Sequence, residues 1–290
     1  MAEHTLDDSD ASARDGVFGS QRRQPTQGRR RSGSRRLTDA VIFVVSIASA
    51  LILWQVVSQT GLVDERDLPS MTSTVSELGS MVKTTAFWSA FAHTAQGWAV
   101  GLLVAAVLAI PLGIVLGLSP LTASAFRVPV EFLRPIPSAA LIPLLFLTLG
   151  TNFKSEVFLA AFGAFWPILL QTMYGIRDVD PVTTDTARSF RIPRSGRLWR
   201  ITLPSAVPYI ATGMRIASAV ALILAFTAEL FMGTPGLGSK LNYAQSFGLT
   251  TQLYALALAT GVLGLATHLV FAAIEHRALR WHPSQRAEVL

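Results

Sequence analysis

The chain has 290 residues, of which 51% are hydrophobic and only 14% are charged, with a formal net charge of +6. Soluble domains usually carry about 25% charged residues, so this composition argues against a soluble enzyme and favours a protein embedded in lipid. The chain has no cysteine, which excludes a disulfide framework and a thiolate metal site within it.

The first segment, residues 1–37, is rich in arginine, serine and glycine and has few large apolar side chains. It cannot bury enough surface to offset chain entropy, so we predict a disordered basic tail. Such tails can neutralise nucleic-acid phosphates, but an apolar span follows at once, so we interpret this one as an orientation signal. The small residues 48–50 lie inside the apolar run, which argues against a cleaved signal peptide.

Six apolar segments are long enough to cross roughly 30 Å of hydrocarbon as helices of about 20 residues. They lie at about 39–58, 92–118, 121–149, 155–176, 204–231 and 250–275. The third contains prolines at positions 129, 135, 137 and 143, so we expect it to be kinked or broken. Such a break is tolerated in lipid only where protein or an aqueous cavity surrounds the backbone. The sequence therefore predicts an all-α integral membrane protein with about six transmembrane helices.

Basic residues orient these spans. With the tail inside, the outer loops 59–91, 150–154 and 232–249 hold Arg66, Lys83, Lys154 and Lys240. The inner segments hold the eight arginines of the tail, Arg127, the six arginines of segment 177–203, and Arg277, Arg280 and Arg286. This distribution satisfies the positive-inside rule, so we expect a multi-pass protein of the plasma (inner) membrane with both termini in the cytoplasm.

The outer loop 59–91 contains an amphipathic segment. Its apolar residues recur at helical spacing among serine, threonine and glutamate, which predicts a short helix near the outer surface. These residues are Met71, Val75, Leu78 and Val82. Two interpretations stay open: the helix covers the bundle, or it docks a partner.

Small residues recur every four positions through the second span. Another helix can approach this face closely, because no large side chain lies between the two backbones. The members of the row are Gly97, Gly101, Ala105, Ala109, Gly113 and Gly117. The row packs either against another span of the same chain, which we favour, or against a second copy.

The polar segment 177–203 begins with the signals of a short helix. Asp180 is a good N-cap and Pro181 suits the first helical position. Asp185 lies early enough in the helix to complement its dipole. Pro193 is expected to stop the helix.

A second short helix is expected between Pro193 and Pro204, which opens the next span, and it carries Leu198, Trp199 and Ile201. A helix-turn-helix with an exposed apolar side favours a protein partner. The alternative is a membrane-surface helix held by arginines and anionic lipid.

This segment resembles the coupling loop of binding-protein-dependent ABC importer permeases, whose motif is Glu-Ala-Ala, three residues, Gly, and about nine more residues to Ile-x-Leu-Pro. Residues 185–187, Asp-Thr-Ala, stand where Glu-Ala-Ala would be, and residues 201–204 match the end of the motif. Arg191 occupies the usual glycine position. The resemblance covers about residues 85–280 and is closest to the nitrate, sulfonate and taurine branch. Further matching stretches are 132–137, 139–144, 165–167, 203–208, 213–215, 228–229 and 236–238.

The resemblance implies an ABC type I importer permease fold and a role as the transmembrane permease subunit of an ATP-driven importer. A second permease copy in a homodimer, two ATP-binding subunits and an extracytoplasmic solute-binding protein are the implied partners. ATP and Mg²⁺ would belong to the partner ATPase, and this chain is expected to be no enzyme and to bind no cofactor, metal or nucleic acid. The implied ATPase-coupling residues are Asp185, Thr186, Ala187, Arg188, Phe190, Arg191, Leu203 and Pro204.

These features divide the chain into a basic cytoplasmic tail (1–37), a first transmembrane helix with an extracytoplasmic loop (38–91), a permease core (92–276) and a cytoplasmic C-terminal tail (277–290). The coupling loop is residues 177–203 of the core. The sequence has no G-x-x-x-x-G-K-[ST] motif, so ATP must be hydrolysed by another chain.

Ionisable residues inside spans are costly and mark functional candidates. The candidates for the translocation pathway are Glu131, Arg134, Arg215 and Glu229. Glu131 and Arg134 are three residues apart and able to pair, and Arg134 is the leading candidate for attracting an anion. Arg215 is expected to pair or to snorkel, and Glu229 to anchor the outer mouth or to contact solute.

The branch suggests a small anion as the solute, such as an aliphatic sulfonate, taurine or nitrate. The alternative is the same role for a vitamin precursor or an aromatic acid. A secondary transporter would need inverted repeats and its own coupling-ion site, and the sequence has no convincing repeat. A membrane-embedded enzyme would need a catalytic constellation, and none is visible.

Overall fold

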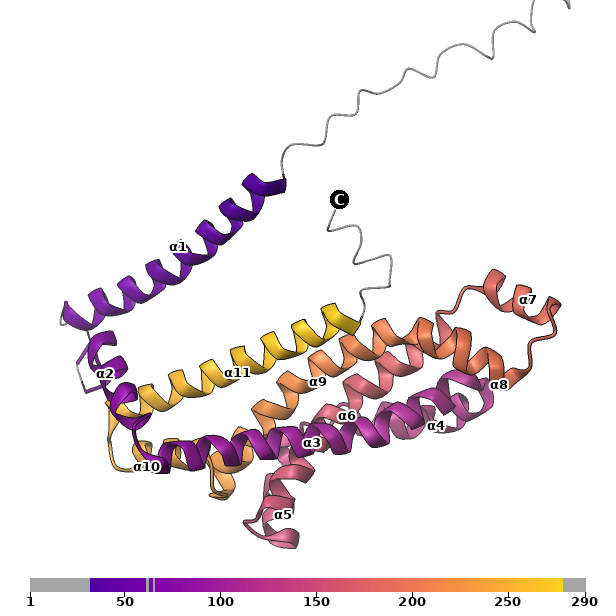
Figure 1. The fold of residues 1–290 in the computed structure, drawn as a ribbon. Helices are drawn as coiled ribbons and strands as arrows, with labels where there is room; N and C mark the ends of the chain where they lie inside the picture. Colours follow the sequence, from indigo (N-terminus) through magenta and orange to yellow (C-terminus); the bar gives the residue numbers. More distant parts are fainter. Residues whose placement is uncertain (1–31, 61–62, 65, 279–290) are drawn as a thin grey trace, which may run out of the picture. The chain divides into compact units, whose positions relative to one another are not determined.

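The computed structural model describes residues 32–60, 63–64 and 66–278 (Figure 1). Every regular element in this part of the chain is helical, so the predicted all-α fold is confirmed. The main helices are α1 (Ser32–Gln59), α2 (Met71–Met81), α3 (Thr85–Leu118), α4 (Pro120–Leu133), α5 (Ile142–Leu149), α6 (Phe153–Arg177), α7 (Pro181–Ser189), α8 (Arg194–Arg197), α9 (Leu203–Met232), α10 (Leu237–Ser246) and α11 (Thr250–Ala278). A 3₁₀ helix (Ser138–Leu141) precedes α5, and a π-helical turn (Leu198–Thr202) joins α8 to α9.

Four helical stretches of the described residues are long and apolar enough to cross a membrane: α3, α6, α8 with α9, and α11. The bent pair of α4 and Ser138–Leu149 brings this number to five if it is counted as one span. The sixth expected span, 39–58, lies in α1, whose described apolar stretch is Ala48–Gln59.

The chain divides into two compact units, Met1–Leu53 and Trp54–Leu290. α1 begins at Ser32, so the last six residues of the expected tail, 32–37, are helical. The rest of that tail and residues 279–290 lie outside the described residues.

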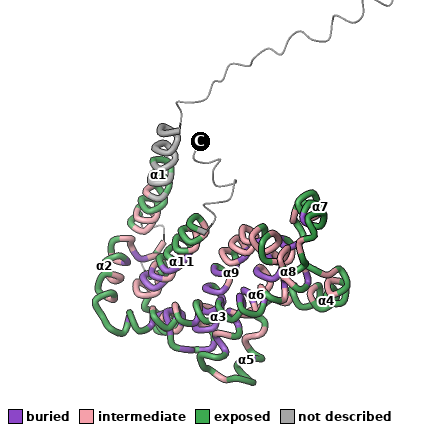
Figure 2. Tube along the Cα trace, turned by 45° about the vertical axis from the view of Figure 1, so that its right-hand side comes forward, coloured by how far each residue is buried: buried purple, intermediate pink, exposed green. Residues whose placement is uncertain are grey.

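The core of the second unit lies between α3, α6 and α9, where buried residues concentrate (Figure 2). Most of its members are alanines. Because small side chains let helices in lipid approach closely, this composition produces tight packing rather than a wide apolar layer. The buried alanines are Ala105, Ala106, Ala109, Ala160, Ala164, Ala217, Ala221 and Ala225.

The small-residue row of α3 lies against α6. A Cβ atom added at Gly101 would lie 2.6 Å from Ala160 Cβ, and one added at Gly117 would lie 2.6 Å from Ile176 Cβ. Gly113 faces Thr172 in the same way, at 2.7 Å. From one facing pair to the next, the residue numbers rise by the same amount on both helices, so α3 and α6 run in the same direction in a fixed register. The row is therefore in contact with a span of its own chain.

The third span is broken, as its prolines predict. α4 ends at Leu133, and the 3₁₀ helix and α5 follow at an angle of 77°. Pro135 and Pro137 lack backbone donors and disfavour helical geometry in the residues before them, which explains why no helix covers positions 134–137. None of the residues of α4 is buried, so this helix is exposed along its whole length (Figure 2).

The expected amphipathic helix of the outer loop is α2, and it covers the bundle by packing against α11. The predicted apolar face was partly wrong. Val75 is 48% exposed and Val82 lies beyond the helix end, whereas Thr74 is buried and Leu78 and Met81 contact the core.

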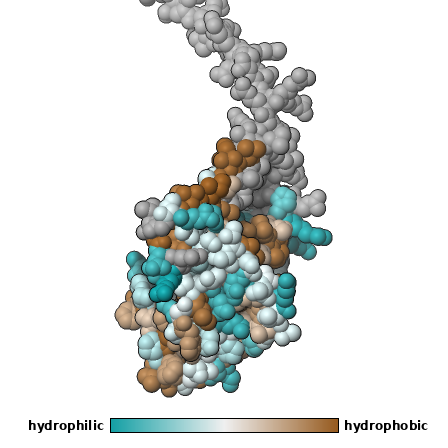
Figure 3. Space-filling view, turned by 90° about the vertical axis from the view of Figure 1, so that its left-hand side faces the viewer, coloured by the Kyte–Doolittle hydropathy of each residue, from teal (hydrophilic) through white to brown (hydrophobic). Residues whose placement is uncertain are grey.

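The two ends of the second unit carry different elements. α7 and α8 lie at one end of the bundle, and α2 and α10 at the other (Figure 1). Seen from the α2 and α10 end, the surface mixes hydrophilic with hydrophobic residues (Figure 3). Such a mixture fits a surface at the boundary between membrane and water.

Candidate functional site

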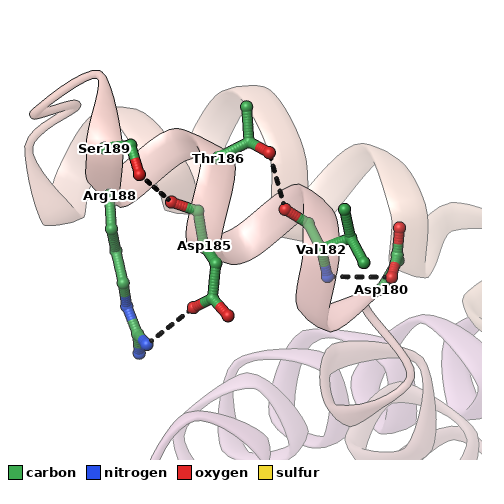
Figure 4. Close-up of polar contacts among 6 residues, drawn as sticks. All are labelled: Asp180, Val182, Asp185, Thr186, Arg188 and Ser189. Carbon is green, nitrogen blue, oxygen red and sulfur yellow. Dashed lines mark hydrogen bonds and ion pairs between the residues drawn. The ribbon is translucent and has the colours of Figure 1, made fainter.

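The coupling loop forms α7 for the local reasons that its sequence predicts. Asp180 caps the helix, because its Oδ1 accepts a hydrogen bond of 2.9 Å from the Val182 amide (Figure 4). Thr183 Oγ1 donates to the second carboxylate oxygen at 3.0 Å. These bonds, the Val182 amide first and the Thr183 hydroxyl second, lower the pKa of Asp180, because they stabilise the charged carboxylate.

Asp185 lies on the exposed surface of α7. Its carboxylate pairs with Arg188 Nη1 at 3.1 Å, and both side chains are largely exposed (Figure 4). Such a surface pair contributes little to stability, so both groups can exchange partners at low cost. The hydroxyls of Thr186 and Ser189 donate to backbone carbonyls one turn earlier. Asp185 and Arg188 are therefore the charged groups that α7 offers to a partner.

The end of α7 differs from the prediction. The helix ends at Ser189, before Pro193, and Arg191 adopts a left-handed backbone with φ of +54°. The Ile192 amide then donates to the Ala187 carbonyl at 3.0 Å, which closes the helix end. Glycine favours this conformation, which explains why the related motif has glycine where this chain has Arg191.

The second short helix is also different from the expected one. α8, the π-helical turn and α9 form one continuous stretch, Arg194–Met232, in which α9 begins at Leu203 directly after the π-helical turn, with Pro204 in its first turn. Pro204 is tolerated because it stands in the first turn of α9.

Large apolar side chains are exposed on the coupling loop. The exposed fractions of Val182, Phe190 and Trp199 are 71%, 78% and 70%. By contrast, Ala187 of α7 is buried, with 3% of its surface exposed. Exposed aromatic and aliphatic groups among arginines are typical of a surface that a protein or a membrane covers.

The candidate pathway charges have different surroundings. The expected pair of Glu131 with Arg134 was wrong, because Glu131 Oε1 accepts from Arg127 Nε at 2.8 Å instead. Arg134 is exposed at the C-terminal end of α4. Arg215 pairs across the bundle with Glu275 of α11, where Nη1 lies 3.1 Å from Oε2 in an ion pair without hydrogen-bond alignment.

Glu229 is fully buried near the C-terminal end of α9. Its Oε2 accepts from Thr94 Oγ1 of α3 at 2.9 Å and from the Gly238 amide of α10 at 2.8 Å. The Leu237 amide donates to the same threonine hydroxyl at 2.9 Å. Of the two roles expected for Glu229, these contacts favour the anchor of the outer mouth.

Glu156 of α6 is a buried acid that the sequence analysis missed. Its side chain is 1% exposed, and its Oε1 has no hydrogen-bond partner. It lies beside Gly97, the first member of the small-residue row. One sequence feature could have indicated this burial: Glu156 lies four residues before Ala160, on the α6 face that packs against α3. Within the described residues, no set of three or more histidine, aspartate or glutamate side chains forms a metal site.

Known proteins match most of the chain. It is 28% identical over 254 residues to the taurine transport system permease protein TauC of Escherichia coli (strain K12), covering 86% of this chain and 91% of the relative. It is 27% identical over 274 residues to the bicarbonate transport system permease protein CmpB of Synechococcus elongatus, covering 87% and 97%. It is 28% identical over 201 residues to the nitrate import permease protein NrtB of Leptolyngbya laminosa, covering 69% and 72%.

A solved structure of the MetNI methionine ABC transporter in an inward-facing conformation shares the fold. The TM-score is 0.55 at 17% identity, and the match covers 67% of this chain and 94% of that chain. Residues 109–280 match the family model described as a binding-protein-dependent transport system inner membrane component. The chain therefore belongs to this family of inner membrane components of binding-protein-dependent transport systems.

Proposed function

We propose that the chain is the membrane-spanning permease subunit of an ATP-driven importer of a small anion. The observation that carries this proposal is the exposed surface of the coupling loop, where Val182, Phe190 and Trp199 stand among arginines at one end of the bundle. A short rigid helix with exposed apolar groups fits into a groove on a partner protein. That partner is a separate ATPase subunit, which binds ATP and Mg²⁺.

The mechanism follows from the rigidity of the loop. α8, the π-helical turn and α9 are continuous, so a force on the coupling loop is transmitted along a single helix to the outer end. There Glu229 ties α9 to α3 and α10. Closure of two ATPase subunits on ATP therefore moves the walls of a pore formed by two permease copies. A solute-binding protein delivers the anion from the outer side, and both termini lie in the cytoplasm.

The proposed substrate class is a small oxyanion. The named relatives transport taurine, bicarbonate and nitrate, all of which present oxygen acceptors around a small centre. Aliphatic sulfonates share the sulfonate group of taurine. The basic inner end of the chain favours anions over cations by its electrostatic potential.

Charge reversal in the coupling loop tests this function. Asp185→Lys is expected to abolish co-purification of the ATPase subunit and uptake of labelled taurine or nitrate into proteoliposomes, while the chain still inserts into the membrane. Glu77→Lys, on α2 at the opposite end, makes the same charge change and is expected to retain both activities. Normal ATPase retention and uptake in Asp185→Lys would contradict the proposal, and so would loss of both in the control.

A further inference from the structure

A cavity of about 290 Å³ lies where the end of α4 meets α6 and α9. Its polar lining comes from Arg134 at the end of α4 and from Trp166, Gln171 and Tyr174 on one side of α6. Leu170 and Ile216 supply apolar walls. A small pocket with a few polar groups on an apolar wall is the usual form of a ligand site.

The polar lining of this cavity consists of hydrogen-bond donors. The guanidinium and the indole only donate, whereas the amide and the phenol both donate and accept. No carboxylate lines the cavity. The Trp166 indole Nε1 is shielded from solvent and has no hydrogen-bond partner. A buried donor without an acceptor is costly, so an oxyanion in the cavity would satisfy the indole once the ring turns to present Nε1 to it.

Arg134 is available for such a ligand. The nearest acid along α4, Glu131, is already held by Arg127 at 2.8 Å. Among the described residues, the guanidinium of Arg134 has no ion pair. Because an unpaired guanidinium is a strong attractor of oxyanions, it supplies the charge that the neutral donors of α6 lack.

Close packing between α6 and α9 surrounds the base of the Gln171 side chain. Gly213 of α9 lies so near Gln171 that a Cβ atom added there would lie 2.9 Å from Gln171 Cβ. The contact holds the base of the Gln171 side chain in the wall of the cavity. The α6 backbone that carries Gln171 is therefore held against α9 before a ligand binds, which lowers the entropy cost of ordering this wall.

A second cavity continues toward the end of the bundle where α7 lies. It has a volume of about 740 Å³ and shares Arg134 and Tyr174 with the first. Arg127 and Arg177 line it further along, and its one acid is Glu131, which is already paired. The two cavities share part of their walls, and the unpaired charge of both linings is positive, so they attract anions and repel cations.

We propose that Arg134, Trp166, Gln171 and Tyr174 form a contact site for a small oxyanion, such as a sulfonate, nitrate or bicarbonate, on its way to the cytoplasm. The inference rests on the proposed function, because an importer of anions must release them at this end. In this site, the three α6 residues act together with Arg134 and donate hydrogen bonds to the oxygens of the solute.

Fluorine NMR of the complete complex tests this site. The chain is labelled with 5-fluorotryptophan, assembled with its ATPase subunits in nanodiscs and titrated with sodium ethanesulfonate or sodium nitrate, with sodium chloride as the salt control. Trp166→Phe identifies the Trp166 signal among the six tryptophans. We expect a saturable shift of the Trp166 signal and none at Trp98, whose Nε1 already donates to the Ser218 carbonyl at 3.0 Å.

Variants make the assignment specific. Arg134→Gln and Gln171→Leu are expected to weaken the apparent affinity at Trp166 at least tenfold, whereas Arg66→Gln in the outer loop leaves it unchanged. Tyr174→Phe is a milder test that removes only one hydroxyl. An unmoved Trp166 signal, equal shifts at all tryptophans, or an equal response to chloride would overturn the proposal. ATPase retention in the same sample reports on the proposed function separately, so the two failures are distinguishable.

Discussion

The carboxyl group of Glu156 on α6 occupies the space that a side chain at Gly97 on α3 would need. Gly97 is buried, and Glu156 is 1% exposed. The close approach of the N-terminal parts of the two helices therefore depends on the absence of a side chain at position 97. This pair links the small-residue row of α3 to a buried acid that has no hydrogen-bond partner at Oε1.

Gly97→Ala is expected to destabilise the chain by about 1–3 kcal/mol, because the added methyl group overlaps the Glu156 carboxyl. Glu156→Ala in the same chain removes that overlap, so the double variant is expected to be more stable than Gly97→Ala alone. Thermal unfolding in detergent measures all four members of the cycle. Purely additive effects of the two substitutions would contradict the contact.

Glu229 predicts a contrast between two substitutions. Glu229→Ala leaves the buried Gly238 amide without an acceptor, at a cost of about 1–3 kcal/mol, whereas the Thr94 hydroxyl can still donate to the Ala90 carbonyl at 3.2 Å. Glu229→Gln keeps an acceptor oxygen of the same shape and is expected to cost much less. Hydrogen exchange at the Gly238 amide is the direct measurement. Equal exchange rates in the two variants would show that this oxygen does not hold α10.

Arg191→Gly is expected to stabilise the end of α7 by roughly 1 kcal/mol, because glycine adopts a left-handed backbone without steric cost. Arg191→Ala is the matched control, since it removes the charge and keeps the Cβ atom. Hydrogen exchange of the Phe190 and Ile192 amides, which close the helix end, is expected to slow only in the glycine variant. The same slowing in both variants would attribute the effect to charge.

Asp180 predicts a pH dependence at the start of α7. Its pKa lies below the ordinary aspartate value of about 3.9, because the folded helix stabilises the carboxylate. The cap therefore contributes its stability above the unfolded pKa and loses it as the pH falls through the lower, folded value. Carbon-13 NMR of labelled aspartate side chains gives the midpoint, with Asp180→Asn identifying the signal. A midpoint at or above 3.9 would contradict the cap.

Sequence alone predicts those features that depend on local pattern. Apolar runs of the right length predict the spans, and the prolines near position 135 predict the break after α4. Asp180 and Pro181 predict the start of α7, because capping uses residues within one turn. The row of small residues in α3 predicts close packing, but only the structure identifies α6 as the helix against which the row packs.

The predictions that failed depend on three-dimensional geometry, which the spacing of residues in the sequence does not specify. Arg215 meets Glu275, a residue of another span, so only the folded bundle brings the two together. α7 ends before Pro193 because Arg191 turns left-handed, a conformation that propensity assigns to glycine. Trp166 and Gln171 were not predicted as site residues, because only the folded chain places them beside Arg134 at one cavity.

The proposed function requires that the coupling loop lies in the cytoplasm, where an ATPase subunit can reach it. The chain has no native cysteine, so a single one reports its side of the membrane without background. Ser189→Cys in α7 and Gln245→Cys in α10 are both exposed positions, at opposite ends of the bundle. A membrane-impermeant maleimide applied to intact spheroplasts is expected to label position 245 and not position 189, with the reverse in inside-out vesicles. Labelling of position 189 from outside would place the coupling loop beyond the reach of any ATPase and contradict the account.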